Sequence, residues 1–211
     1  QEKPDVALLA LHGKFAEDGI VQGICEYLKI PYSGTGVLGS ALCMDKVLTK
    51  QILTFNKIPT ADFEFVDSRK TALAEFKTRI SFPLVVKPSR DGSSMGISIC
   101  KSSSDLPQAL ELAAQFDYEI LIEPFLEGPE LTVPILDDRA LTPIEILPKK
   151  GFYDYTNKYT SGQTDYYLPP RISEKEASLL KELALKTHRI CHARVYSRVD
   201  FSIHKGEMFV I

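Results

Sequence analysis

The chain has 211 residues, of which 44 % are hydrophobic and 25 % are charged, and its formal net charge at pH 7 is −3. These values are close to the averages for globular proteins, so they exclude disordered, collagen-like and coiled-coil chains. The slightly acidic balance also excludes a basic nucleic-acid-binding protein, although a local basic patch is still able to hold phosphate.

The first part of the chain alternates between strand and helix patterns. Residues 6–11 form an uninterrupted hydrophobic run, which is typical of a buried parallel strand. Helical spacing follows over 20–28 and again over 44–57, where Pro59 ends the pattern. Between these helices, 34–39 reads as a glycine-rich connection. The strand–helix order at the start predicts an open parallel sheet.

The middle of the chain predicts an antiparallel arrangement around one unusual loop. The expected elements are a strand over 63–66, a short helix over 72–80, strands over 82–87 and 97–101, a helix over 105–116 and a strand over 119–126. The loop 88–96 is rich in Gly and Ser. A loop of this composition between two strands predicts a hairpin with a mobile tip that is rich in hydrogen-bond donors.

The last third predicts two more hairpins and one long helix. The hairpins are expected to pair 130–136 with 140–147 and 195–203 with 208–211. A capping box that starts at Ser173 begins a helix that reaches about residue 191. These hairpins predict antiparallel sheet with helices on one side, so the fold class is mixed α and β.

The cysteines and the hydrophobic runs restrict the cellular setting. Four widely spaced cysteines form no C-x-x-C motif: Cys25, Cys43, Cys100 and Cys191. They are typical of buried thiols in a reducing compartment rather than of a disulfide framework or a zinc site. Every hydrophobic run is far shorter than the ~20 residues of a membrane span, and no signal peptide is visible.

The loop 88–96 and the lysine before it form a candidate phosphate site. Small residues let the backbone approach a ligand closely, and N–H groups and Ser hydroxyls are able to surround phosphate oxygens. Lys87 ends a hydrophobic strand, where its charge needs an anion or a ligand. The alternatives are a flexible hairpin and a snorkelling strand-end lysine. The two features together favour phosphate binding.

The strand over 119–126 is a candidate edge for a nucleotide base. Alternation puts Leu121, Glu123 and Phe125 on one face. A carboxylate and free backbone groups at a strand end suit adenine, and Glu130 is placed to hold ribose hydroxyls. The alternative is a solvated edge strand.

Arg198, Asp200 and Ser202 share one face of the next-to-last predicted strand. Asp200 is able to hold Mg²⁺ through oxygen, and Arg198 is able to stabilise developing negative charge. The alternative is a surface salt bridge between these two side chains. We expect the residue just after Ile211 to lie across from Asp200, so that a second metal ligand lies just outside the chain.

Two further segments are candidates for the site. Residues 149–170 show no periodicity but hold five of the nine tyrosines, which favours a lid over a packed Ω-loop. His12 lies where a predicted strand ends and a helix begins, the usual ligand-binding place in open α/β sheets. The alternative for His12 is a hydrogen-bonded turn histidine.

A series of short motifs runs through the chain in a fixed order. The motifs are Leu11-His12-Gly13, Glu17-Asp18-Gly19, residues 31–36, Met44-Asp45-Lys46, residues 86–96, Gly128-Pro129-Glu130, residues 152–159 and Arg198-Val199-Asp200. This series resembles the D-alanine–D-alanine ligases of the ATP-grasp superfamily. The resemblance implies a partial N-terminal α/β substrate domain over 1–43, a central ATP-grasp subdomain over 44–123 and a C-terminal ATP-grasp subdomain over 124–211. ATP would lie between the last two, under a lid over 149–170.

The resemblance also implies roles for individual residues. The ATP-binding set is Lys46, Lys87, Ser93, Ser94, Glu123, Leu126, Glu130, Tyr153 and Lys158. The catalytic set is Arg198, Tyr159, Ser93 and His12, and the ligand to Mg²⁺ or Mn²⁺ is Asp200. Tyr159 would tie the lid to a serine of the phosphate loop, and its presence favours D-alanine as the second substrate.

The implied activity is the ATP-dependent joining of two D-alanines through a D-alanyl phosphate, for peptidoglycan precursor synthesis. The resemblance implies a cytoplasmic homodimer without nucleic-acid or membrane partners. The alternatives are another ATP-grasp carboxylate–amine ligase and a nucleotide-binding fragment without activity. The family pattern extends beyond both ends of this chain, so we expect the chain by itself to be a poor catalyst. Two departures are Pro124, where many relatives have Lys, and Phe15-Ala16, which replaces a glycine-rich stretch.

Overall fold

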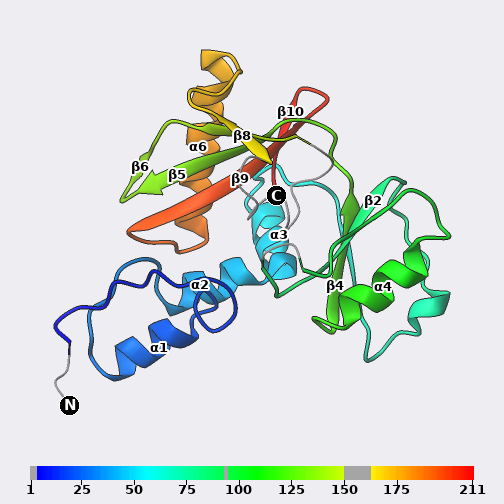
Figure 1. Ribbon diagram of the computed structural model, residues 1–211, viewed down its shortest axis with the longest axis horizontal. Coiled ribbons are helices and arrows are strands. Elements are labelled where there is room, and N and C mark those ends of the chain that lie inside the picture. Colours follow the sequence, from blue (N-terminus) through cyan, green and yellow to red (C-terminus); the bar gives the residue numbers. More distant parts are fainter. Residues whose placement is uncertain (1–3, 93–94, 150–162) are drawn as a thin grey trace.

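The computed structural model describes residues 4–92, 95–149 and 163–211 (Figure 1). A helical N-terminal segment is followed by a four-stranded sheet and a six-stranded sheet. Helix α3, Lys46–Phe55, lies between the two sheets in Figure 1. The predicted class, mixed α and β with antiparallel sheets, is confirmed.

The N-terminal segment departs from the predicted parallel sheet. Residues 6–11 do not form a strand; within the described residues their pairing reduces to one parallel bridge between Ala7 and Tyr32. Val6 and Leu8 are 64 % and 80 % exposed. A hydrophobic run becomes a buried strand only where strands pair with it and helices cover it, and the described part of the chain supplies neither here.

The predicted glycine-rich connection over 34–39 was wrong, because a second helix begins inside it. Helix α1 spans Ile20–Tyr27 and helix α2 spans Val37–Met44. A Cβ added to Gly39 would lie 2.6 Å from the carbonyl oxygen of His192. The glycine therefore serves close packing of α2 against the end of a distant helix rather than a loop conformation.

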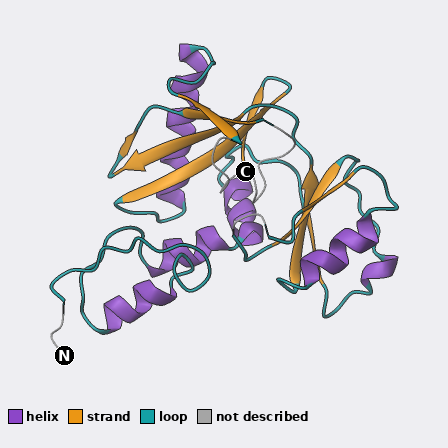
Figure 2. Cartoon of the chain, viewed as in Figure 1, coloured by secondary structure: helices purple, strands orange, loops and turns teal. Residues whose placement is uncertain are grey.

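The smaller sheet has strand order β1-β4-β2-β3, and every pair is antiparallel. Its strands are β1 (Glu64–Asp67), β2 (Leu84–Pro88), β3 (Ser98–Cys100) and β4 (Glu119–Pro124). Helix α4, Leu106–Ala114, packs on one face (Figure 2), where its Leu110 joins the core. The helix predicted over 72–80 shrinks to a single 3-10 turn, Leu73–Glu75.

The larger sheet confirms the predicted final hairpin, and it confirms the other hairpin in part, because the strand predicted over 140–147 is split into two short strands that both pair with 130–136. Its order is β10-β9-β5-β7-β8, and β6 pairs with β5. The strands are β5 (Glu130–Leu136), β6 (Arg139–Ala140), β7 (Ile144–Pro148), β8 (Thr164–Tyr167), β9 (Tyr196–His204) and β10 (Glu207–Val210). Helix α6, Glu174–Ile190, begins at the predicted capping box.

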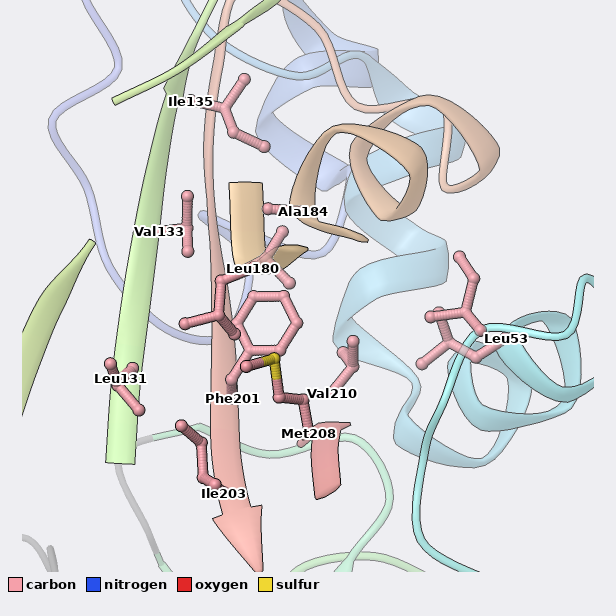
Figure 3. Close-up of a cluster of buried hydrophobic side chains, with 12 residues drawn as sticks. Leu53, Leu131, Val133, Ile135, Leu180, Ala184, Phe201, Ile203, Met208 and Val210 are labelled. Carbon is pink, nitrogen blue, oxygen red and sulfur yellow. The ribbon is translucent and has the colours of Figure 1, made fainter. Parts of the chain in front are cut away.

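The core of the larger sheet is built from alternate residues of its central strands. Leu180 and Ala184 of α6 pack against Leu131 and Phe201 of the sheet (Figure 3). Leu53 of α3 joins the same cluster. The helix that follows the N-terminal segment is thereby tied to the C-terminal sheet. The other face of β5 and β9 is left for polar side chains.

The register of the final hairpin corrects one expectation. Val210 pairs with Phe201, and the Ile211 amide donates a 3.1 Å hydrogen bond to the Asp200 carbonyl. Ile211 itself therefore lies across from Asp200, rather than the residue after it. The cysteine prediction also needs one correction: all four are free thiols and three are buried, but Cys43 is exposed.

Candidate functional site

The face of the smaller sheet opposite α4 carries the first part of the candidate site. Val85 pairs with Glu123, and Lys87 pairs with Leu121, across the antiparallel strands β2 and β4. Because directly paired residues point to the same side of a sheet, all four side chains share one face. The neighbours Leu84, Val86, Ile120 and Ile122 fill the opposite, helix-covered face.

Glu123 is the centre of this face and is 6 % exposed. Its carboxylate pairs with the ammonium groups of Lys87 and Lys50, and the Lys50 Nζ–Oε2 distance is 2.8 Å. Burial by itself raises the pKa of Glu123, but the two lysines outweigh burial and hold that pKa well below its usual range. The carboxylate is therefore ionised and accepts hydrogen bonds only.

Lys50 is a site residue that the sequence patterns did not single out. It lies one helical turn after Lys46 on α3, and a spacing of four residues places two side chains on the same face of a helix. That spacing was the available signal. Its side chain is 7 % exposed, so burial lowers the pKa of Lys50 while Glu123 opposes this effect.

Lys50 also joins the two sheets. Its Nζ donates to the Thr60 hydroxyl at 2.7 Å, and that hydroxyl donates to the Val210 carbonyl at 3.0 Å. Thr60 and Val210 form a parallel β-bridge at the same point. The polar face of the smaller sheet is thereby connected to β10, beside the strand that carries Asp200.

The base of the phosphate loop is held by the start of α3. The Ser89 hydroxyl donates to Asp45 Oδ1 at 2.9 Å and accepts from the Val47 amide at 3.2 Å. Asp45 is the N-cap of α3 and accepts from the Leu48 amide at 3.0 Å. The Met44-Asp45-Lys46 motif and the loop that starts at Pro88 therefore meet, although they are over 40 residues apart.

Lys46 and Arg90 complete the base of this loop. The Lys46 Nζ donates to the carbonyl oxygens of Ser89, at 3.1 Å, and of Asp91. Burial, followed by the neighbouring Lys87, lowers the pKa of Lys46 to about 8. Arg90 makes two 3.0 Å hydrogen bonds to the Asp117 carboxylate. Lys46 and Lys87 therefore place two ammonium groups beside the loop predicted to hold phosphate.

The second part of the candidate site is the polar face of the larger sheet. Thr132 pairs with Asp200, and its hydroxyl donates to Asp200 Oδ1 at 2.7 Å. Arg198 donates to Asp200 Oδ2 at 2.8 Å. Glu130 pairs with Ser202 on the same face. The surface salt bridge that was the alternative for Arg198 thus exists, and the Arg198 side chain is 61 % exposed.

The predicted metal ligand, Asp200, is contacted by the Thr132 hydroxyl and the Arg198 guanidinium. Within the described ranges, no three His, Cys, Asp or Glu side chains lie together in a way that holds a metal ion. Mg²⁺ in nucleotide sites commonly uses one or two carboxylates and takes its other ligands from phosphates and water. The residues present therefore fit a cation that arrives with a nucleotide, not one held by the described side chains alone.

The connection between β4 and β5 places Leu126 and Glu130. The Ile203 amide donates to the Pro129 carbonyl at 3.1 Å, so this connection packs on the end of β9. A Cβ on Gly128 would lie 1.8 Å from the Ile203 carbonyl oxygen. Only glycine fits this close approach, which explains the glycine of the Gly128-Pro129-Glu130 motif.

Of the remaining predicted site residues, the structure describes only some. His12 is exposed and lies in a loop rather than at a strand end. The Tyr196 hydroxyl, two residues before Arg198, donates to the Leu9 carbonyl at 3.3 Å, so the segment before His12 reaches the start of β9. The predicted lid and loop residues outside the described residues are Ser93, Ser94, Tyr153, Lys158 and Tyr159.

Comparison with known proteins points to one family. A family profile described as D-ala D-ala ligase C-terminus matches residues 52–211. A D-alanine–D-alanine ligase of Pelotomaculum thermopropionicum is 42 % identical over all of this chain and 70 % of its own length. One from Geobacter sulfurreducens is 44 % identical over 96 % of this chain and 64 % of its own length.

Solved structures agree with the sequence comparison. A D-alanine–D-alanine ligase of Bacillus anthracis superimposes with a TM-score of 0.87 at 36 % identity, over 98 % of this chain and 68 % of its own. The VanG D-Ala:D-Ser ligase of Enterococcus faecalis has a TM-score of 0.87 at 33 % identity, over 99 % and 63 %. The chain thus spans about two thirds of the length of its relatives.

None of the helices that the structure describes is long and hydrophobic enough to cross a membrane.

Proposed function

Because the chain belongs to the D-alanine–D-alanine ligase family, we propose that its protein uses ATP to join two D-alanines into D-alanyl-D-alanine. The observation that carries this proposal is the cluster of Lys46, Lys87 and Glu123 beside the Ser/Gly-rich loop. Two buried or half-buried cations and an ionised carboxylate suit a nucleotide, which presents both phosphates and a base with an amino group.

The nucleotide would lie along the first polar face. Lys46 and Lys87 would contact the phosphates, together with Lys158 and the loop residues Ser93 and Ser94. Glu123 and the backbone at Leu126 would hold adenine, and Glu130 would hold the ribose. Tyr153 would complete the ATP-binding set from the lid.

The reaction would proceed in two steps. The carboxylate of the first D-alanine attacks the γ-phosphorus of ATP, which breaks the bond to ADP and forms D-alanyl phosphate. The amine of the second D-alanine then attacks the carbonyl carbon, phosphate leaves with its bonding electrons, and the amine loses a proton. Both steps move negative charge onto phosphate oxygens, so positioned cations supply most of the catalysis.

The second polar face would supply part of that charge. Arg198 would contact the developing oxyanion, and its exposed guanidinium is close to Asp200. Asp200 would hold Mg²⁺ or Mn²⁺, and the bound cation supplies neutralisation of the phosphate charge. His12 would lie near the first D-alanine, while Tyr159 would tie the lid to the phosphate loop.

The proposal extends to the organisation and setting of the protein. The three parts 1–43, 44–123 and 124–211 would correspond to a partial substrate domain and two ATP-grasp subdomains. The predicted lid over 149–170 includes Thr164–Tyr167, which form strand β8 of the larger sheet, so only the residues before β8 would act as a lid. The protein would act as a cytoplasmic homodimer in the synthesis of peptidoglycan precursors.

The proposed function is tested on the full-length protein by measuring ADP release as a function of added D-alanine. We expect release that requires D-alanine and yields D-alanyl-D-alanine. L-alanine, D-lactate and D-serine serve as comparison substrates, the last because one relative is named as a D-Ala:D-Ser ligase. Equal activity with any of these three would overturn the assignment of D-alanine as second substrate.

A further inference from the structure

The buried ammonium group of Lys50 is fully engaged by the protein itself. A lysine ammonium has three N–H donors. One is used by Glu123 at 2.8 Å and one by Thr60 at 2.7 Å, and Nζ lies 5.4 Å from the centre of the Phe63 ring, within cation–π range. Lys50 is therefore held in place without a ligand.

Thr60 fixes the direction of the hydrogen bonds that link Lys50 to the larger sheet. Its single hydroxyl proton is donated to the Val210 carbonyl at 3.0 Å. The oxygen therefore faces Lys50 only as an acceptor. Because Val210 and Thr60 are also joined by a β-bridge, the backbone of the larger sheet fixes where the Lys50 ammonium lies.

Lys87 is more exposed than Lys50 and lies closer to the loop that is proposed to hold phosphate. Both lysines bind Glu123, but Lys87 lies at the end of β2, next to the phosphate loop, and its side chain is 14 % exposed against 7 % for Lys50. In the proposed site, a phosphate beside the loop would attract Lys87 away from Glu123 and leave Oε1 available. Lys50 stays on Oε2, since Thr60 and Phe63 hold it.

We propose that Lys50 is a positioning residue that keeps Glu123 ionised and aimed at the base, and thereby makes the site select a 6-amino purine over a 6-keto purine. This inference rests on the proposed function. An ionised carboxylate accepts a hydrogen bond from the amino group of adenine and repels the keto oxygen of hypoxanthine. A buried carboxylate without a cation takes up a proton, and the resulting hydroxyl donates to that keto oxygen equally well.

The experiment uses ADP and IDP, which differ only in the 6-amino or 6-keto group of the base and in the proton that the keto form carries on N1. Binding of each to the full-length protein is measured by calorimetry, without D-alanine, so that the result does not depend on ligase activity. Lys50→Met should reduce the preference for ADP over IDP by about tenfold. A buried polar group without a hydrogen-bond partner costs about a factor of ten in affinity, and this cost should no longer fall on IDP alone. Thr60→Val should reduce it in the same direction by a smaller factor.

Two other variants keep the test decisive. Lys175→Met, an exposed lysine of α6, is the matched control and should leave the preference unchanged. If Lys50→Met does not fold, Thr60→Val carries the test, because it removes a hydrogen bond that positions the Lys50 ammonium and leaves both Lys50 and Glu123 in place. An unchanged preference in folded Lys50→Met, or equal losses of affinity for both nucleotides, would overturn the inference. Failure of the wild-type protein to bind ADP would instead reject the proposed nucleotide site itself.

Discussion

The Ser89 hydroxyl donates a 2.9 Å hydrogen bond to the Asp45 carboxylate, and both side chains are buried. The contact joins the base of the phosphate loop to the N-terminus of α3, whose first turn Asp45 caps. A loop that is proposed to hold phosphate needs a fixed base, because the base sets where the first backbone groups of the loop lie. Asp45 supplies that base and the helix cap at once.

The Ser89–Asp45 contact predicts a stability cost for truncating Ser89. Ser89→Ala should lower the free energy of unfolding by about 1–3 kcal/mol, since it leaves the Val47 amide without its partner and removes one of the two hydrogen bonds to Asp45 Oδ1. Urea unfolding measures this value. Ser81→Ala, at an exposed serine in the segment before β2, should stay within about 0.5 kcal/mol of wild type. Equal effects of the two substitutions on the free energy of unfolding would contradict a stabilising role of the Ser89–Asp45 hydrogen bond.

Lys87 predicts a loss of nucleotide affinity. Lys87→Ala removes an ammonium group beside the phosphate loop, so affinity for a non-hydrolysable ATP analogue should fall by about 10- to 100-fold, the value of a charge-assisted hydrogen bond. Calorimetric titration measures it. The exposed Lys101, at the far side of the same hairpin, is the control. Unchanged affinity in folded Lys87→Ala would argue against a phosphate site here.

Replacing Arg198 should reduce the activity of the protein without reducing its stability. Its ion pair with Asp200 involves a side chain that is 61 % exposed, so its contribution to stability is about 0–1 kcal/mol. Arg198→Ala should therefore unfold near the wild-type urea concentration, while kcat falls by about 10²–10³-fold if the guanidinium stabilises the oxyanion. Arg139→Ala, on β6 of the same sheet, should change neither. A normal kcat in Arg198→Ala would remove this residue from the catalytic set.

Gly128 predicts a packing defect. A methyl group at this position would overlap the Ile203 carbonyl oxygen, 1.8 Å away, so the connection between β4 and β5 must shift. Gly128→Ala should destabilise the fold by about 1–3 kcal/mol or more and weaken nucleotide binding, because Leu126 and Glu130 move with the connection. Gly92→Ala meets no atom within 4 Å and is the stability control. Indistinguishable melting temperatures for the two variants would be the contrary outcome.

Glu145 predicts a pH dependence of stability away from the site. Hydrogen bonds from the Arg171 side chain, foremost, and then from its backbone amide lower the pKa of Glu145. A carboxylate with a lowered pKa stabilises the fold above its unfolded pKa of about 4.3. That stabilisation is lost as the pH falls through the lowered value. The stability gap between wild type and Glu145→Gln should thus be larger at pH 7 than at pH 3, as measured by urea unfolding. A constant gap would contradict the cause assigned to the shift.

Local patterns in the sequence determined most elements of this protein. The Ser173–Glu176 capping box begins α6, and alternation places Arg198 and Asp200 together on one face of β9. Lys87 in a hydrophobic strand was also sufficient to single out the polar face on which it meets Glu123. Each of these features depends on residues within a few positions of one another, where helix and strand periodicity dictate which side chains meet.

Tertiary structure alone decided which distant groups meet. Glu123 lies 73 residues from Lys50 along the chain, and no periodic pattern predicts that a buried lysine on α3 will reach it. The run over 6–11 is another example. Its hydrophobicity is a local property and predicted a strand, but a strand forms only where distant segments pair with it. Periodicity acts over a turn or a strand, whereas ion pairs, buried hydroxyls and sheet partners depend on how whole elements pack.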